Sequence, residues 1–290
     1  MARVSVVIPT FNRRDLLPDA VRSALSQTHP DVEVVVVDDG STDGTAEILK
    51  QRFPKVKVLR QENRGCAAAT NAGIRASIGS TICVLGDDDL LEPETLARAH
   101  RVLEENPRLA MVYADAWVQD GLAGPVLREA CVAAGEDPGD LAAALFLDST
   151  LSTPSVVVRR EAGDAVGWFR EDQRYNEDTD FLIRLASGRR ARRLPEPASR
   201  IRRHAGSKSR HPLQIASALF FSQRALWEAL PELRHALGER GMQRLDRLAT
   251  DLLAAALRSA RPALARQARQ HLGWRLLAPA TLLRLLRGLR

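Results

Sequence analysis

Five short apolar runs alternate with longer amphipathic segments through the first 115 residues, and this alternation constrains the fold more than any other feature. The apolar runs lie at residues 4–8, 33–37, 56–59, 81–85 and 110–114. Strands that are apolar throughout, rather than at every second position, are typical of parallel sheets covered by helices on both faces. The sequence therefore predicts an α/β fold with a mostly parallel central sheet flanked by helices.

Acidic residues follow two of these strands at the point where each strand ends. Asp38 and Asp39 follow the second strand, and the triplet Asp87, Asp88 and Asp89 follows the fourth. Both clusters should lie together, because ligands of such folds bind at the edge formed by the carboxyl ends of the strands. Adjacent carboxylates repel one another, and hard oxygen ligands suit Mg²⁺ or Mn²⁺. The alternative is a solvated turn that caps the next helix.

Motifs that define several other classes of protein are absent. No GxGxxG follows the first strand and there is no GxxxxGK[ST], which argues against the usual nicotinamide enzymes and P-loop nucleotidases. There is also no GxSxG and no HExxH. The cysteines Cys66, Cys83 and Cys131 form no CxxC, which favours buried, reduced thiols in a cytosolic protein. No apolar run predicts a membrane-spanning helix, and the first ten residues lack the features of a signal peptide.

Positive charge is concentrated towards the end of the chain. Residues 1–200 carry 25 Lys and Arg against 31 Asp and Glu, a balance of −6, whereas residues 201–290 carry 17 against 5, a balance of +12. Apolar residues recur there at helical spacing: Leu245, Leu248, Leu252, Leu253 and Ala256. We expect a basic helical extension over residues 211–290. Its last helices would either lie on an anionic membrane or pack on the protein itself.

Four segments, in this order, resemble the motifs of family 2 glycosyltransferases of the GT-A fold. They read VSVVIPTFNR at 4–13, VVVVDDGSTDGT at 34–45, NRGCAAATNAG at 63–73 and VLGDDDLLEP at 84–93. The resemblance covers about residues 3–210. It implies a GT-A domain over residues 1–210, with a nucleotide-binding half at about 1–115 and an acceptor and catalytic half at about 116–210.

The resemblance assigns nucleotide-binding roles to particular residues. The matching positions are Pro9, Thr10, Phe11, Asp39 and Arg64. Phe11 would pack against the base ring, although a core aromatic at a strand end is the alternative. Asp39 would accept a hydrogen bond from a base N–H, which fits uracil well. Thr70 stands where relatives often carry a basic residue, so one nucleotide contact of the family is not expected here.

The acidic triplet can be matched to the family's Asp-x-Asp pattern in two registers. Counting back from Pro93, Gly86 stands where many relatives carry the first Asp, which makes Asp88 the metal-binding residue and lets Asp87 face the ribose. In the other register, Asp89 lies on the metal. We favour Asp88, with Asp87 and Asp89 in support, and the implied cofactor is Mn²⁺ or Mg²⁺.

Two further segments resemble the catalytic part of the family. Residues 175–181 resemble the Glu-Asp signature ahead of a helix, so that Asp178 would be the catalytic base and Glu177 its neighbour. The alternative is a helix N-terminus that favours acidic residues. Arg203 and His204 lie in a segment that resembles the family's lid, which would approach the diphosphate or the metal.

The resemblance implies a metal-dependent inverting glycosyltransferase that moves one sugar from a nucleotide-diphosphate sugar, UDP- or dTDP-linked, to a hydroxyl of a glycan or lipid-linked acceptor. Its role would be in cell-surface polysaccharide biosynthesis. Processive synthases combine Gln-x-x-Arg-Trp with membrane spans, whereas residues 270–274 read QHLGW. A nucleotidyltransferase, disfavoured by the first loop, and a non-catalytic scaffold are the alternatives.

The expected location follows from the same features. We expect a cytoplasmic protein, with peripheral contact at the inner face of the cytoplasmic membrane through the basic C-terminal helices as an open alternative. No nucleic-acid partner is expected, because aromatic residues make up only 4% of the chain and no reading motif accompanies the arginines.

Overall fold

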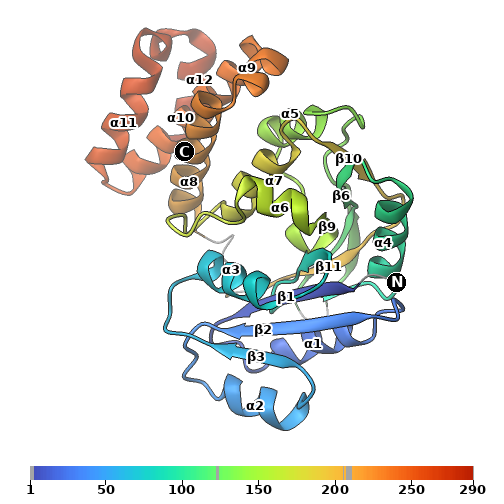
Figure 1. Ribbon diagram of the computed structural model, residues 1–290. Helices are drawn as coiled ribbons and strands as arrows, with labels where there is room; N and C mark the ends of the chain where they lie inside the picture. Colours follow the sequence, from blue (N-terminus) through green and yellow to red (C-terminus); the bar gives the residue numbers. More distant parts are fainter. Residues whose placement is uncertain (1–2, 122–123, 205, 207–210, 290) are drawn as a thin grey trace. The chain divides into compact units, whose positions relative to one another are not determined.

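The computed structural model describes residues 3–121, 124–204, 206 and 211–289. The chain divides into two compact units (Figure 1). The first comprises Met1–Leu145 and Ser149–His204, and the second comprises Phe146–Asp148 and Ala205–Arg290. The segment of the predicted lid beyond His204 continues through residues 205 and 207–210, which lie outside the described residues.

The first unit is built on a seven-stranded sheet of order β10-β6-β9-β4-β1-β2-β3. Its strands are β1 (Val4–Thr10), β2 (Val32–Asp38), β3 (Lys57–Arg60), β4 (Thr81–Val84), β6 (Leu109–Tyr113), β9 (Val156–Arg159) and β10 (Arg190–Arg193). All neighbours pair in parallel except β9, which runs antiparallel to both β4 and β6. The predicted mostly parallel sheet is therefore confirmed.

Helices cover both faces of this sheet. They are α1 (Leu17–Leu25), α2 (Thr45–Arg52), α3 (Cys66–Ala76), α4 (Thr95–Glu105), α6 (Arg160–Val166) and α7 (Glu177–Ala186), with α5 (Asp140–Leu147) running to the boundary of the unit. Val34 and Val36 of β2 belong to the core that includes α1, whereas Val35 and Val37 pack with Ala69 of α3. Because successive strand residues face opposite ways, α1 and α3 lie on opposite faces.

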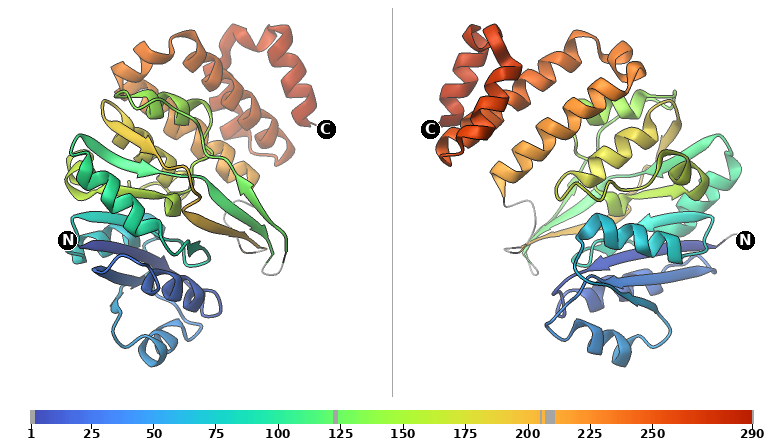
Figure 2. Two further views of the ribbon diagram at one scale, coloured as in Figure 1. Left: turned by 90° about the vertical axis from the view of Figure 1, so that its right-hand side faces the viewer. Right: turned by 60° about the vertical axis from the view of Figure 1, so that its left-hand side comes forward.

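A second sheet of four strands extends the first unit, in the order β5-β11-β7-β8. Its strands are β5 (Leu90–Leu91), β7 (Ala116–Asp120), β8 (Val126–Glu129) and β11 (Ser199–Arg203). β7 and β8 pair antiparallel as a hairpin. β11 pairs in parallel with β7 and antiparallel with β5, which directly follows the acidic triplet (Figure 2).

Two helices of this unit begin without a side-chain cap. Helix α1 begins at Leu17, and Pro18 occupies its first turn. Proline is accommodated there because the first N–H groups of a helix have no intrahelical partner. Helix α4 begins at Thr95, also without a side-chain cap.

The second unit is helical, as predicted. Its helices are α8 (Pro212–Ala229), α9 (Pro231–Leu237), α10 (Glu239–Arg258), α11 (Pro262–Leu272) and α12 (Pro279–Leu289). Helix α10 packs against α8, α11 and α12. The five apolar residues expected on one face of this region, Leu245 to Ala256, are all buried. Among the described residues, no helix has the length and apolar character needed to cross a membrane.

Gly73 allows α3 to pack closely on the sheet. A Cβ atom there would lie 2.4 Å from Cγ1 of Val7 and 3.0 Å from Cγ2 of Val37. We expect Gly73→Ala to lower the free energy of unfolding by about 1–3 kcal/mol, although alanine is otherwise the better helix former. Urea unfolding followed by circular dichroism measures this change. The control is Arg75→Ala on the exposed side of the same helix, where we expect about 0.5 kcal/mol or less. Equal stability of the two variants would show that α3 can shift away from the sheet.

Candidate functional site

The carboxyl ends of β1, β2 and β4 meet at one edge of the large sheet. Thr10 pairs with Asp38, and Val7 pairs with Val84, so the residues after β4 extend to the level of Thr10. Contacts confirm that the two acidic clusters lie near the same loop: the backbone N–H of Phe11 donates to Oδ2 of Asp87 at 3.4 Å, and that of Asp39 donates to the carbonyl of Thr10 at 2.8 Å.

The loop after β1 is held firmly to the loop after β2. The backbone N–H of Asn12 donates to Oγ of Ser41, and Oδ1 of Asn12 accepts from the N–H of Thr42, both at 2.9 Å. Asn12 adopts a left-handed backbone conformation with φ of 53°, which asparagine tolerates better than most residues. Pro9 and Thr10 are buried, whereas Phe11 is 44% exposed. The Phe11 ring is therefore accessible for stacking with a ligand, and it is not part of the core.

Asp39 anchors the loop between β3 and α3. Its Oδ1 accepts from Nε2 of Gln61 at 2.8 Å and from the N–H of Arg64 at 2.9 Å, and its Oδ2 accepts from the N–H of Gly65 at 2.8 Å. The buried neighbour Asp38 accepts from the N–H of Ser41 at 2.8 Å. Asp39 thus shapes the loop that contains Arg64.

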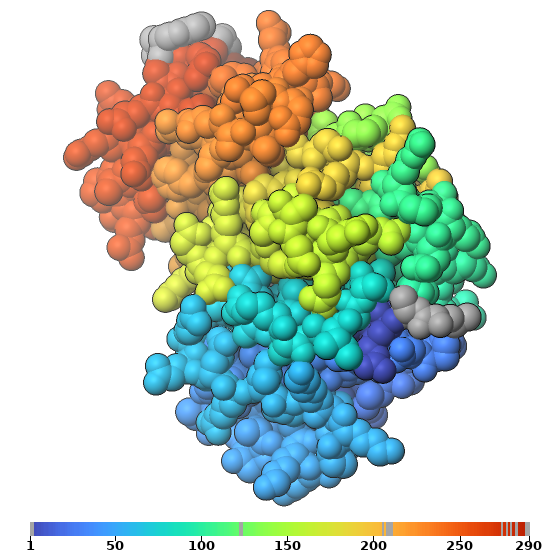
Figure 3. Space-filling view, viewed as in Figure 1, coloured from blue at the N-terminus to red at the C-terminus, as the bar shows by residue number. Residues whose placement is uncertain are grey.

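The guanidinium of Arg64 contacts the segment between α6 and α7. Its Nη2 lies 2.9 Å from Oε2 of Glu171. Oε1 of Glu171 also accepts from Nδ2 of Asn71 at 3.0 Å, and Asn71 exchanges two hydrogen bonds with the backbone of Phe169, of 2.8 and 3.1 Å. The space-filling view shows the surface of α3 meeting the yellow-green residues of this segment (Figure 3). The sequence analysis singled out neither Asn71 nor Glu171. The feature of the sequence that could have indicated this contact is the asparagine within an alanine-rich helix.

The three carboxylates of the triplet have different partners. Asp87 faces the first loop, with Nε of Arg13 3.9 Å from its Oδ1. Oδ2 of Asp88 lies 3.0 Å from Nε2 of His204. Asp89 is buried and accepts from the backbone N–H of Arg202 at 3.0 Å. The structure therefore brings Asp88 and His204 together, and Asp89 ties the triplet to β11.

Gly86 explains how the triplet folds back over its own strand end. A Cβ atom at Gly86 would lie 2.9 Å from Oδ2 of Asp89 and 3.1 Å from Oδ1 of Asp88. These separations are shorter than ordinary contacts, so a side chain at this position would displace both carboxylates. Gly86 departs from the family's Asp-x-Asp pattern, and its lack of a side chain leaves room for the carboxylates of Asp88 and Asp89.

The electrostatics of the triplet favour a bound cation. Burial, followed by the negative charge of Asp88, raises the pKa of Asp87 to about 7 and that of Asp89 to about 8. Carboxylates and an imidazole are donors that Mg²⁺ and Mn²⁺ accept. Within the described residues, no three acidic, histidine or cysteine side chains already form a complete metal site. Asp88 and His204 would hold part of the coordination shell of such an ion, and substrate phosphates and water usually supply the rest.

Adjacent arginines of β11 have opposite environments. Arg202 is 6% exposed, its Nε donates to the carbonyl of Asp88, and its Nη1 lies 3.0 Å from Oδ2 of Asp19. Arg203 is exposed, and its Nη2 pairs with Oε1 of Glu129 at 2.9 Å. The structure thus pairs Arg203 of β11 with Glu129 of β8 and gives the buried position beside the triplet to Arg202.

Glu177 and Asp178 form the first turn of α7. A three-residue turn joins this helix to β10, which runs parallel to β6, so α7 starts at the carboxyl edge of the sheet and runs back along it. Glu177 is buried, and Oδ1 of Asp178 accepts from the N–H of Thr179 at 2.7 Å. The two acids therefore share the edge on which the triplet lies.

A buried ion pair fixes the start of α7. Asp180 is fully buried, and its Oδ2 accepts from Nε of Arg184 at 2.8 Å. The same guanidinium donates to the carbonyls of Val166, Gly167 and Trp168. The turn ahead of α7 is therefore held by its own helix, which limits the movement of Asp178.

Asp115, which follows β6, is a structural carboxylate. Burial would raise its pKa, but hydrogen bonds from Arg193, the N–H of Cys131 and Arg128 outweigh this effect and lower the pKa to about 2. Arg128 and Arg193 belong to β8 and β10, so Asp115 joins the two sheets. A carboxylate that holds its proton so weakly is a poor general base at neutral pH.

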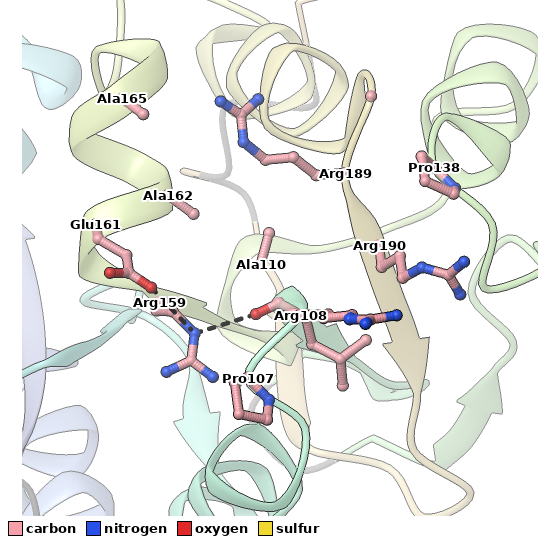
Figure 4. A pocket seen from close by; sticks show the side chains of 12 residues that line it. Pro107, Arg108, Ala110, Pro138, Arg159, Glu161, Ala162, Ala165, Arg189 and Arg190 are labelled. Carbon is pink, nitrogen blue, oxygen red and sulfur yellow. Dashed lines mark hydrogen bonds and ion pairs between the residues drawn. The ribbon is translucent and has the colours of Figure 1, made fainter.

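A cavity of about 420 Å³ lies at the opposite edge of the large sheet, where β6 and β10 begin. Its lining includes Arg108, Arg159, Arg189 and Arg190 (Figure 4). The guanidinium groups point in different directions, and that of Arg159 is bonded to the carbonyls of Leu103 and Leu109. The cavity offers no converging set of donors, so the carboxyl edge is the stronger candidate site.

The first half of the chain matches known proteins clearly. Residues 5–127 match the model of glycosyl transferase family 2. The match is a similarity of this segment, which is less than half of the chain, to that family. An uncharacterized glycosyltransferase of Haemophilus influenzae is 27% identical over 187 residues, which are 63% of this chain and 61% of that protein. Chondroitin synthase of Escherichia coli is 38% identical over 113 residues, 38% of this chain and 16% of the synthase.

Solved structures of glycosyltransferases share the fold of this chain. S. aureus TarS 1–349 in complex with UDP-GlcNAc has a TM-score of 0.62 and 19% identity, covering 93% of this chain and 88% of that one. Mannosyltransferase PcManGT from Pyrobaculum calidifontis, in complex with GDP-Man and Mn²⁺, has a TM-score of 0.59 and 22% identity, covering 99% and 84%. The predicted GT-A fold is confirmed. The chain spans 61% of the Haemophilus relative and smaller shares of the other curated relatives, 18% and 36% for the next two.

The contrast between Arg202 and Arg203 is testable. We expect Arg202→Met to lower the free energy of unfolding by about 2–4 kcal/mol, because it removes a buried cation from Asp19 and from the backbone of the triplet. The matched control, Arg203→Met, breaks an exposed pair and should cost about 0–1 kcal/mol. Urea unfolding followed by circular dichroism measures both. Equal losses in the two variants would contradict the assigned roles.

Proposed function

We propose that the chain is a metal-dependent inverting glycosyltransferase that transfers one sugar from a nucleotide-diphosphate sugar to a hydroxyl group. The observation that carries the proposal is the meeting of Asp88 and His204, 3.0 Å apart, at the edge of the sheet where α7 also begins. The similarity of residues 5–127 to glycosyl transferase family 2 supports the reaction class. The solved relatives that hold UDP-GlcNAc and GDP-Man support a nucleotide-sugar donor.

In this proposal the first loop and the β2 loop hold the nucleotide. Phe11 stacks on the base, and the loop shaped by Asp39 closes around the base edge. Asp87, which faces the first loop, lies where the ribose would follow. Arg64 borders the same loop but is paired with Glu171, so donor binding and this ion pair compete for one guanidinium.

Asp88 and His204 are the residues proposed to lie beside the diphosphate of the donor. A divalent cation, Mn²⁺ or Mg²⁺, would supply Lewis-acid neutralisation of the charge that develops on the leaving diphosphate. Asp88 and His204 hold such a cation from two elements, the end of β4 and the end of β11. Asp89 and Arg202 keep these two elements together, because the Asp89 carboxylate accepts the N–H of Arg202.

Asp178 is the proposed general base. A hydroxyl group is a poor nucleophile at neutral pH, and removal of its proton by a positioned carboxylate contributes about 10²–10⁴-fold to the rate. Burial of Glu177 and the Asp180–Arg184 pair fix the turn that carries Asp178. Attack from the side opposite the leaving diphosphate inverts the anomeric centre.

The acceptor is proposed to be a glycan or a lipid-linked saccharide of cell-surface polysaccharide biosynthesis. The match to chondroitin synthase, over 38% of this chain, supports polysaccharide chemistry. We propose transfer of a single sugar, and a cytoplasmic site of action. A lipid-linked acceptor would bring the protein to the inner face of the cytoplasmic membrane.

Donor binding should depend on a divalent cation and on Asp88. We expect one donor among UDP-, dTDP- and GDP-sugars to bind at least about tenfold more tightly with Mn²⁺ than with EDTA, because a cation held by Asp88 and His204 would neutralise the charge of the diphosphate. Asp88→Ala should lose this gain. Isothermal titration calorimetry measures both, with Asp172→Ala, an exposed acid, as the control. No nucleotide binding under any condition would instead favour a scaffold on a transferase fold.

Asp178→Asn should separate binding from chemistry. We expect donor affinity to stay within about twofold and sugar transfer, or slow donor hydrolysis, to fall by about 10²–10⁴-fold, because the amide cannot take up a proton. Release of nucleoside diphosphate gives the rate, and proton NMR of the product gives the anomeric configuration. Asp172→Asn is the matched control. Full turnover of Asp178→Asn, or retention of configuration, would refute the assignment.

A further inference from the structure

We propose that the second unit binds anionic lipid headgroups through an exposed arginine surface at the end of α10 and along α11. We call this surface the arginine stripe. It consists of Arg258, Arg261, Arg266 and Arg269. The proposal concerns the second unit alone, and it stands apart from the nucleotide site, so either can be correct without the other.

The stripe lies in a part of the chain that has no acidic residue. The last carboxylate is Asp251, and residues 252–290 contain no Asp or Glu. The same segment contains eight arginines: Arg258, Arg261, Arg266, Arg269, Arg275, Arg284, Arg287 and Arg290. An ordinary solvated helix mixes both signs of charge, and a segment with one sign alone creates a field that attracts anions.

Ion pairing separates the stripe from the arginines that stabilise the unit. Nε of Arg275 lies 3.2 Å from Oδ2 of Asp246, and Nη2 of Arg284 lies 2.6 Å from Oδ2 of Asp251. By contrast, the four arginines of the stripe are exposed, and none of them pairs with a carboxylate among the residues that the structure describes. The unit uses its nearby acids for internal packing and leaves the stripe without counter-charge.

The packing of α11 determines which way the stripe faces. Ala268 and Leu272 are buried in the core that contains Leu248 and Leu252 of α10. Arg266 and the exposed, uncharged Gln270 lie on the opposite side of the helix, and the exposed Arg269 and Gln267 flank the buried face. The apolar face of α11 is thus already used, and any contact with a membrane is made by its basic face.

The turn between α10 and α11 adds an apolar contact to the charges. Arg258 and Arg261 flank this turn, and Leu257 beside them is 50% exposed. Guanidinium groups form bidentate hydrogen bonds with phosphate, and a leucine among them fits the boundary between headgroups and acyl chains. Clusters of four or more basic residues are typical of binding to anionic lipids.

The composition of the stripe favours lipid over nucleic acid. Proteins that bind single-stranded nucleic acids combine basic grooves with aromatic side chains on which bases stack. The stripe and the residues from Leu257 to Gln270 contain no aromatic residue. A lipid surface requires only charge and a shallow apolar contact, and the segment supplies both.

Vesicle sedimentation tests the proposal with the full-length protein. We expect binding to vesicles with about 30% phosphatidylglycerol in phosphatidylcholine at about 50 mM salt, no binding to pure phosphatidylcholine, and release at about 500 mM salt. The variant Arg258→Gln, Arg261→Gln, Arg266→Gln and Arg269→Gln should partition at least about tenfold less. The matched control neutralises four exposed, unpaired basic residues of the first unit: Lys50→Gln, Arg52→Gln, Lys55→Gln and Arg101→Gln.

The outcomes distinguish the stripe from general basicity and from other polyanions. Retained binding by the control, with loss in the stripe variant, supports the proposal when circular dichroism shows the same melting temperature for both. Equal loss in the two variants would show that net charge alone is responsible and would overturn it. Tighter binding to a duplex DNA oligonucleotide than to the vesicles would also overturn it and would make nucleic acid the partner. Donor binding should be unchanged in the stripe variant.

Discussion

A buried guanidinium connects the parts of the candidate site. Arg202 donates to the backbone of Asp88, pairs with Asp19 at the start of α1, and offers its own N–H to Asp89. A buried cation is stable only when carboxylates and carbonyls surround it, so these partners are drawn to one place. His204 follows two residues later on the same segment, and its approach to Asp88 depends on the position of β11. The contacts of Arg202 therefore position Asp88 and His204 relative to each other.

The acidic triplet holds like charges close together in a largely buried position, which is unfavourable for the stability of the fold. Burial and mutual repulsion raise the pKa of Asp87 and Asp89, which means that the ionised protein without a cation is strained at this edge. Gly86 tolerates the crowding because it has no side chain to displace the carboxylates. Local rules are commonly violated at functional sites, where a ligand restores the balance. Two other buried acids of the first unit have arginine partners: Asp180 pairs with Arg184, and Asp115 pairs with Arg128 and Arg193.

The two units divide opposite charges between them. The region up to residue 200 is net acidic, at 25 basic against 31 acidic residues, and the acidic triplet lies at one sheet edge. The second unit uses the core around α10 to order its helices, and its acids Asp246 and Asp251 pair with Arg275 and Arg284. The four arginines of the stripe have no carboxylate partner among the residues that the structure describes. The stripe is therefore the surface of the second unit that is best suited to bind an anion.

The sequence by itself determined the strands, the order of the motifs and the edge at which the acids gather, because apolar runs and strand ends are local features. It also indicated the resemblance to family 2 glycosyltransferases, through four motifs in matching order and spacing. Only the tertiary structure decided that Arg202 and not Arg203 lies beside the triplet. Alternation along a strand places neighbours on opposite faces, but which face is covered depends on the pairing of β11 with β5 and β7. The clamp between Asn71 and Glu171 likewise joins residues 100 positions apart, and no local pattern encodes such a contact.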